Sequence, residues 1–243
     1  MSVEFDQIPF APAYRKVADA IGERILSRNL REGERLPAET ELARQFGVHR
    51  STVREALREL QSRGLLERRP GSKLMSVSRP PQERIAEGVS HALLLHDVTV
   101  RDVWQALTIL EPPIAAAAAG ARSAQDLAAL DSATAAFSTT MADAEAAVHN
   151  TSEVFRCIAR ATHNTVLGLA QEPLLQLLEP SLRVIIDKVP QARTRIGAAH
   201  VRLGESIRAQ NAAEATRWMQ RHIADFSRGY ELAGIDMGLR LSL

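Results

Sequence analysis

The stretch LPAETELARQFGVHRSTVREALREL, residues 36–60, decides how the N-terminal part of this chain folds. In its first half, Leu42, Ala43 and Phe46 recur at helical spacing, and Gly47 follows as a residue that can turn the chain. Its second half carries four more apolar residues at helical spacing: Val53, Ala56, Leu57 and Leu60. The pattern predicts two short helices joined at Gly47, which is a helix-turn-helix.

A stripe of arginines runs along the second of these helices. Arg50, Arg54 and Arg58 lie four residues apart, and at about 100° per residue they drift by only about 40° per step, so they share one face. Residues 44–73 hold eight basic and three acidic side chains, although the whole chain has a net charge of only +1. Such a local excess is the electrostatic footprint expected of a surface that binds a polyanion.

The segments on both sides of the helix-turn-helix predict a winged domain. A helix over about 13–28 is indicated by three apolar residues four positions apart: Val17, Ile21 and Ile25. Two strand-like runs, 65–69 and 74–78, flank a turn at Pro70 and Gly71. They predict a hairpin, the wing, next to the helix-turn-helix.

The chain divides near two consecutive prolines, Pro80 and Pro81, which interrupt regular structure. We expect a winged helix-turn-helix domain over 1–78, a linker over 79–84 and an all-α helical bundle over 85–243. The expected fold class is therefore mainly α. Seven helices are expected in the bundle, at about 82–95, 100–119, 123–141, 143–162, 165–188, 191–210 and 211–232.

Prolines and capping residues indicate where these helices break, begin or end. We expect the second helix of the bundle to break near Pro112 and Pro113, because proline lacks the backbone N–H that a helix needs. Other kinks or boundaries are expected at Pro173, Pro180 and Pro190. Ser123, with Asp126 three residues later, predicts an N-cap with an acidic capping box.

Composition excludes several classes of protein. The single cysteine, Cys157, rules out an internal disulfide framework and leaves too little sulfur for a cysteine-based zinc site. No stretch reaches the roughly 18 apolar residues of a membrane span, and the N-terminus lacks the apolar core of a signal peptide. We therefore expect a soluble, cytoplasmic protein with no membrane partner. No glycine-rich phosphate loop or nucleophile motif indicates an enzyme.

The N-terminal part resembles the GntR family of bacterial transcription regulators. The resemblance covers most of residues 13–77 in the family's order and spacing. It rests on LPAE (36–39), LA (42–43), FGV (46–48), Arg50, VREAL (53–57), Leu60, GL (64–65) and RPGS (69–72).

The resemblance implies a dimer that binds double-stranded operator DNA, with the second helix in the major groove and the wing beside it. Carried over by position, Arg50, Thr52 and Arg54 are the expected base and phosphate contacts. Arg44 is expected to support a phosphate, and Gly71 to let the wing approach the minor groove. Arginine is also the usual bidentate reader of guanine. The full set of expected DNA-binding residues is Arg44, His49, Arg50, Ser51, Thr52, Arg54, Arg58, Gly71 and Lys73.

Three residues depart from the family's pattern. Ala38 stands where a capping serine is usual, which removes about 1 kcal/mol of cap stability. His49 stands where serine commonly begins the second helix, and we expect it to contact a phosphate. Lys73 replaces the second glycine of the wing, where it either adds a phosphate contact or stiffens the hairpin.

The C-terminal part resembles the effector domain of the FadR-type (FCD) subfamily. The resemblance rests on the Leu110-Glu111-Pro112 segment, on the region from Phe155 to Asn164, and on His200 and His222, which lie 22 residues apart. Many members of this subfamily hold a divalent metal through an Asp and a His one helical turn apart and two later histidines. The metal then binds a carboxylate effector.

This chain departs from the metal-binding pattern. Ser152 occupies the Asp position and Arg156 occupies the His position, and neither is a ligand that a divalent cation prefers. Only His200 and His222 remain, so we expect no cofactor. A residual divalent metal held by His200 and His222 stays an alternative.

Two interpretations of Arg156 follow, and we favour the first. Arg156 replaces the charge of the metal and binds an anionic effector, with Ser152, His200 and His222 as the other effector-binding residues. Alternatively, Arg156 pairs with an acid such as Glu153 or Glu111, which leaves an apolar pocket for an acyl ligand or no effector at all.

The expected function is therefore that of a homodimeric repressor. Its affinity for the operator is modulated by a small, anionic organic effector, a carboxylate, bound in the helical bundle. The alternatives are an effector domain that binds an apolar acyl ligand or a metal, and a bundle that serves only for dimerisation. An enzyme is not expected, because His200 and His222 lack a third ligand and a nucleophile.

Overall fold

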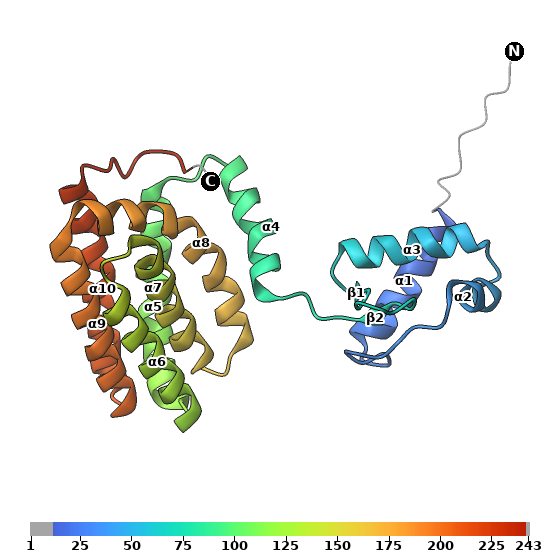
Figure 1. Ribbon diagram of the computed structural model, residues 1–243, viewed down its shortest axis with the longest axis horizontal. Helices are drawn as coiled ribbons and strands as arrows, with labels where there is room; N and C mark the ends of the chain where they lie inside the picture. The colour runs from blue at the N-terminus through green and yellow to red at the C-terminus, as the bar shows by residue number, and fades with distance from the viewer. Residues whose placement is uncertain (1–11, 242–243) are drawn as a thin grey trace, which may run out of the picture. The chain divides into compact units, whose positions relative to one another are not determined.

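The computed structural model describes residues 12–241, so residues 1–11 of the domain predicted over 1–78, and residues 242–243, lie outside the described part. The chain forms two compact units, one ending at Pro81 and the other beginning at Gln82. Ten helices and one two-stranded sheet lie among the described residues (Figure 1). The predicted mainly α fold class is confirmed.

The first unit is a small helical domain with one hairpin. Helices α1 and α2 both pack against α3, and β1 contacts α3 as well. The core is formed by the apolar faces predicted from the sequence, and Val53, Ala56 and Leu60 of α3 are fully buried in it. The elements are α1 (Ala13–Leu26), α2 (Glu39–Phe46), α3 (Arg50–Ser62), β1 (Leu66–Glu67) and β2 (Ser76–Val77).

The turn between α2 and α3 depends on Gly47. This residue ends α2 in the left-handed conformation, with φ 66° and ψ 34°. Its N–H and that of Val48 both bind the carbonyl oxygen of Ala43, which closes the end of α2. The predicted helix-turn-helix is therefore present.

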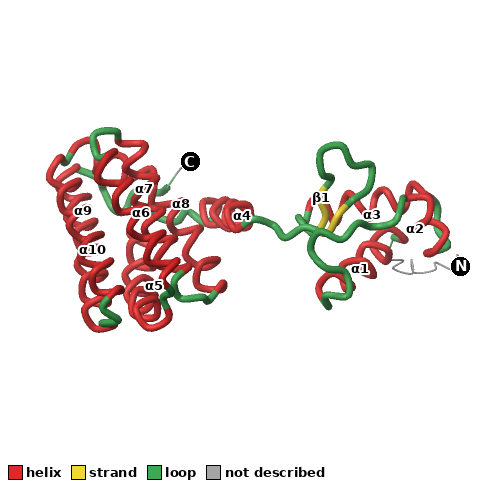
Figure 2. The backbone as a smooth tube through the Cα atoms, turned by 60° about the horizontal axis from the view of Figure 1, so that its bottom comes forward, coloured by secondary structure: helices red, strands yellow, loops and turns green. Residues whose placement is uncertain are grey.

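The wing is an antiparallel hairpin in which Leu66 pairs with Val77. Figure 2 shows the two short strands and the loop that joins them. Gly71 lies in this loop with φ 76° and is exposed, as is Lys73. The hairpin is shorter than the strand-like runs predicted from the sequence, but it lies in the same place.

The second unit is a bundle of seven helices. Helix α5 packs against α7, α8, α9 and α10, while α4 packs against α8. None of the described helices is long and apolar enough to cross a membrane. The helices are α4 (Gln82–Leu95), α5 (Val100–Ala121), α6 (Ala124–Thr140), α7 (Ala144–Arg160), α8 (Thr165–Lys188), α9 (Pro190–Arg208) and α10 (Ala212–Ala233).

The predicted break at Pro112 and Pro113 is wrong, because α5 runs continuously from Val100 to Ala121. The two prolines remove two backbone donors, but the helix around them is held by packing. Leu107 and Ile114 are fully buried on either side, and tertiary packing supplies most helical stability in proteins. The same applies to α8, which contains two internal prolines, whereas Pro190 does begin a helix as predicted.

The predicted cap at Ser123 is confirmed. Its side-chain oxygen accepts a hydrogen bond from the backbone N–H of Asp126, and its own backbone N–H donates to the Asp126 carboxylate at 2.7 Å. Thr99 and Asp102 form the same capping box at the start of α5. Both boxes satisfy donors that a helix leaves unpaired at its first turn.

We predict opposite effects of Gly→Ala substitutions at two positions in this bundle. A Cβ at Gly229 would lie 2.9 Å from a methyl carbon of Ile185, whereas a Cβ at Gly120 meets nothing within 4 Å. We expect Gly229→Ala to lower the free energy of unfolding by about 1–3 kcal/mol through overpacking. We expect Gly120→Ala to raise it by about 0.5–1 kcal/mol through helix propensity.

Urea unfolding followed by tryptophan fluorescence measures both effects. The only tryptophans, Trp104 and Trp218, lie in the second unit, so the signal reports on that unit alone. Equal effects of the two substitutions would contradict the packing at Gly229.

Candidate nucleic-acid interface and effector site

Helix α3 presents its arginines on an exposed face next to its buried one. Arg50 and Arg54 keep 59% and 48% of their side chains exposed, and Arg58 is also exposed. Because the apolar face of α3 is anchored on α1 and α2, the stripe predicted from the sequence is held on a fixed scaffold. An exposed cationic helix of this kind can enter the major groove of DNA.

A groove of about 460 Å³ runs beside this stripe and extends to the wing. Arg68, which follows β1, adds a fourth cation to the three of α3. Sequence reasoning did not single out Arg68, although the basic count over 44–73 contains it. The groove is lined by Glu39, Arg50, Arg54, Leu57, Arg58, Gln61 and Arg68.

Most of the remaining predicted DNA contacts in the helix-turn-helix are exposed, and Thr52 is half-buried. His49 is the N-cap of α3 but makes no side-chain capping bond, and Ser51 is exposed in the first turn. Arg44 at the end of α2 binds Glu41 at 2.6 Å. The N-terminus of α3 is thus open to a phosphate, which helix N-termini favour.

Glu39, the first residue of α2, is a groove residue that the sequence analysis missed as a functional candidate. One oxygen of its carboxylate accepts hydrogen bonds from Arg50 at 2.9 Å and from Arg54 at 3.1 Å. The hydrogen bond from Arg54 lowers the pKa of Glu39, together with that from Arg50, against the opposing effect of burial. Glu39 is therefore a carboxylate that joins the two arginines.

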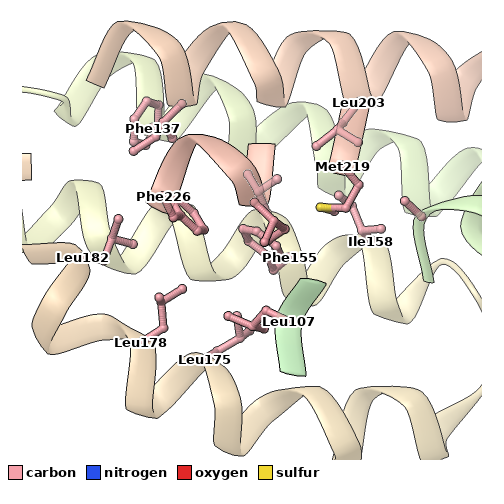
Figure 3. Close-up of a cluster of buried hydrophobic side chains, with 14 of the residues drawn as sticks. Leu107, Phe137, Phe155, Ile158, Leu175, Leu178, Leu182, Leu203, Met219 and Phe226 are labelled. Atoms are coloured by element: carbon pink, nitrogen blue, oxygen red, sulfur yellow. The ribbon is translucent and has the colours of Figure 1, made fainter. Parts of the chain in front are cut away.

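In the second unit, His200 and His222 lie together at the centre of the bundle. Their ring centroids are 5.1 Å apart, and at most 1% of either residue is exposed. They are surrounded by Phe137, Phe155 and Phe226, which Figure 3 shows in the core. Burial lowers the pKa of both histidines, to about 4 for His222, so both rings are neutral at pH 7.

This pair carries unsatisfied polar atoms. Within residues 12–241, none of the four ring nitrogens of His200 and His222 has a hydrogen-bond partner, and neither does the buried hydroxyl of Ser152. A buried polar group without a partner costs about 1–3 kcal/mol, so such groups are rare without a reason. The two adjacent histidines therefore mark the centre of the bundle as the candidate effector site.

Arg156 does not join the histidines. Its Nε and Nη2 atoms each donate to Glu172 at 2.8 Å, and weaker contacts reach Glu179 at 3.4 Å and Glu153 at 3.9 Å. The favoured interpretation, in which Arg156 is held ready for an anionic effector, is therefore not the arrangement observed. Arg156 pairs with an acid, as in the alternative, but its main partner is Glu172.

The reason lies in helix packing that the sequence does not reveal. Glu172 is 16 residues from Arg156 and reaches it because α8 packs against α7. Arg156 and Glu172 both line a cavity of about 300 Å³, whose lining does not include His200 or His222.

Glu111 is also buried, but none of the described residues is a cationic partner for it. Both of its carboxyl oxygens lie 3.0 Å from Nε2 of Gln171, which donates to them. Burial raises the pKa of Glu111 to about 8, and the bond from Gln171 only partly opposes this. Glu111 is therefore mostly protonated at pH 7.

The divalent-metal site that the subfamily implies does not fit these residues. Ser152 offers a neutral hydroxyl, and Arg156 brings a positive charge to the position of a ligand. In the described part of the chain, no group of three or more His, Cys, Asp or Glu side chains is placed to hold a metal. His200 and His222 alone fall short of the ligand sets that proteins use.

The first unit is thus a winged helix-turn-helix of the class that binds DNA, joined to a helical domain with a buried polar cluster. The family model for bacterial regulatory proteins of the gntR family matches residues 13–74, and the model for the FCD domain matches residues 102–225. The chain belongs to the GntR family of transcription regulators and carries an FCD domain. It is a regulator and not an enzyme, as predicted.

Similar proteins agree with this assignment. The repressor NanR of Escherichia coli strain K12 is 25% identical over 222 residues, which cover 90% of this chain and 84% of NanR. The repressor MngR of E. coli strain K12 is 48% identical over 61 residues, and this match spans only a quarter of either protein. The structure of the GntR protein of Streptococcus agalactiae has a TM-score of 0.66 and 25% identity, covering 88% of this chain and 99% of that one.

We predict that Glu111 makes the stability of the second unit fall as pH rises from 6.5 to 8. In this range the folded chain keeps a proton on Glu111 that the unfolded chain, with an ordinary pKa of 4.5, has lost. Stability should therefore decrease by up to about 1.4 kcal/mol per pH unit. Glu111→Gln should remove this contribution to the slope, measured by urea unfolding with tryptophan fluorescence.

The two histidines oppose this slope at the lower end of the same range. The unfolded state, with an ordinary histidine pKa of 6.5, takes up protons as pH falls toward and below 6.5, whereas the buried rings do not, so the histidines make stability fall as pH decreases. Glu205→Gln, at an exposed position on α9, is the control and should keep the wild-type slope between pH 6.5 and 8. An unchanged slope in Glu111→Gln would contradict the burial of a protonated carboxyl group.

Proposed function

We propose that the protein is a repressor that binds its operator as a homodimer and releases it when a small organic effector enters the helical bundle. The observation that carries the DNA-binding part is the groove in which four arginines of α3 and the wing surround one glutamate. The names of the full-length relative NanR and of MngR support repression rather than activation. A protein that acts on DNA is expected in the cytoplasm.

Two-fold symmetry of the dimer determines how its two copies of α3 meet the operator. Two copies of α3 related by a dimer axis read two half-sites about one helical turn apart or closer, so the operator is pseudo-palindromic. The effector changes the population of conformations in which both winged helices match these half-sites. Repression then ends because operator affinity falls.

The effector we propose is a small organic acid with an apolar body. The unpartnered nitrogens of His200 and His222 support this, because a neutral imidazole can donate an N–H to a carboxylate. Phe155 and Phe226 supply apolar surface next to His222. Arg156 is not needed as the anion's partner, since Glu172 already balances its charge.

The DNA-binding role is tested by Arg54→Ala. We expect a loss of about 1–3 kcal/mol in binding to the operator, because one bidentate base contact disappears. The operator is selected from a random duplex library by the full-length protein, and affinities are measured by fluorescence anisotropy at fixed salt. Arg63→Ala is the control, because Arg63 ends α3 outside the groove and should leave operator affinity within about twofold.

An unaffected operator complex in Arg54→Ala would overturn the assignment of α3 as the reading helix. A wild-type protein that selects no sequence from the library would instead indicate an architectural DNA binder.

Native mass spectrometry of the freshly purified protein tests the assembly and the effector together. We expect a dimer that carries no metal and, where a ligand has co-purified, an organic acid. His200→Phe should abolish ligand binding without breaking the dimer, because phenylalanine keeps the ring and removes both nitrogens. One divalent ion per chain in the wild type would overturn the metal-free effector site.

A further inference from the structure

We propose that Glu39 is a positioning residue for reading DNA, which fixes Arg50 and Arg54 so that the terminal edge of each guanidinium group stays free for guanine. The inference rests on the proposed operator-binding role and deepens it. An acidic residue would then increase discrimination between base pairs, although it lies in a groove whose arginines attract phosphate.

The geometry places both arginines on a single oxygen atom. Oε2 of Glu39 accepts from Nε of Arg50 at 2.9 Å, and from Nε and Nη2 of Arg54 at 3.4 and 3.1 Å. Glu39 lies 11 residues before Arg50 and 15 before Arg54, so the contact exists only because α2 packs against α3. It links the two helices of the helix-turn-helix through the side chains of the DNA-binding face.

The bonds to Glu39 use one particular edge of each guanidinium group. A guanidinium group is planar and has five N–H donors. Its side edge presents the N–H groups of Nε and Nη2, and its terminal edge presents one N–H each of Nη1 and Nη2. Arg54 meets Glu39 through its side edge, and Arg50 through its Nε. In the part of the chain that the structure describes, both Nη atoms of Arg50 and Nη1 of Arg54 have no hydrogen bond. The terminal edge is the fork that fits O6 and N7 of guanine.

Glu39 is itself well fixed. Its side chain is only 20% exposed, and as the first residue of α2 it lies at the positive end of the helix dipole, which favours a carboxylate. A free arginine side chain loses rotamer freedom when it is ordered. Arginines that Glu39 already holds lose less conformational entropy when they bind DNA, so more of the contact energy appears as base discrimination.

The same carboxylate weakens attraction to DNA in general. Four arginines line the groove against this one acid, and removing its charge increases the positive potential that draws in any phosphate backbone. Glu39 should therefore lower the affinity for unrelated DNA while it sharpens the reading of the operator. A residue with a purely structural role would not move these two quantities in opposite directions.

The test compares E39Q, E39D and E59Q in the full-length protein. Fluorescence anisotropy gives affinities for the selected operator, for operators with single G·C pairs replaced, and for an unrelated duplex. We expect E39Q to reduce discrimination at one or two G·C pairs by about tenfold, while affinity for the unrelated duplex stays equal or rises. E39D keeps the charge but is one methylene shorter, so it no longer reaches both arginines. It should lose discrimination while its affinity for the unrelated duplex stays at the wild-type value.

E59Q is the matched control. Glu59 lies on α3 and pairs with Arg63 at 2.8 Å outside the groove, so E59Q makes the same change in charge without touching the reading arginines. It should keep the wild-type discrimination. Discrimination by E39Q within twofold of wild type, or an equal loss for all duplexes, would overturn the role of Glu39. A wild-type protein that selects no operator is a separate result, which removes the proposed function together with this inference.

Discussion

The burial of one face of α3 is the constraint on which the DNA-binding half depends. Val53, Ala56 and Leu60 are fully buried between α1, α2 and the hairpin. Their burial fixes the rotation of α3 about its own axis, and therefore which side chains of α3 face solvent. The arginine stripe therefore remains exposed. Gly47 completes the arrangement, since its left-handed turn sets the angle at which α2 delivers Glu39 to the arginines.

Local patterns were enough to predict most of the fold. The apolar spacing of α1 and α3, the turn at Gly47 and the capping box at Ser123 are all decided by neighbours within a few residues. Pro112 shows where such reasoning fails. A proline weakens a helix locally, but the helix persists because its flanks are buried in a core whose other walls are distant in sequence.

The same distinction between local and distant neighbours applies to the residues of the candidate sites. The arginines of α3 could be predicted, because their spacing alone places them on one face, whereas their partner Glu39 could not. His200 and His222 were predicted to belong together and do meet, yet Arg156 turned to Glu172 on a neighbouring helix. Charged side chains pair with the groups that lie near them in the folded chain, and their spacing in the sequence does not predict which groups those are.

The ion pair between Arg156 and Glu172 has a consequence for how this protein can evolve. Only 4% of the Glu172 side chain and 17% of the Arg156 side chain reach solvent, and removing one partner of such a buried pair costs about 3–5 kcal/mol because the other charge is stranded. A neutral residue at position 156 would leave Glu172 without its main cationic partner. Loss of the charge at either position is therefore tolerated best when the other position, on a different helix, changes with it.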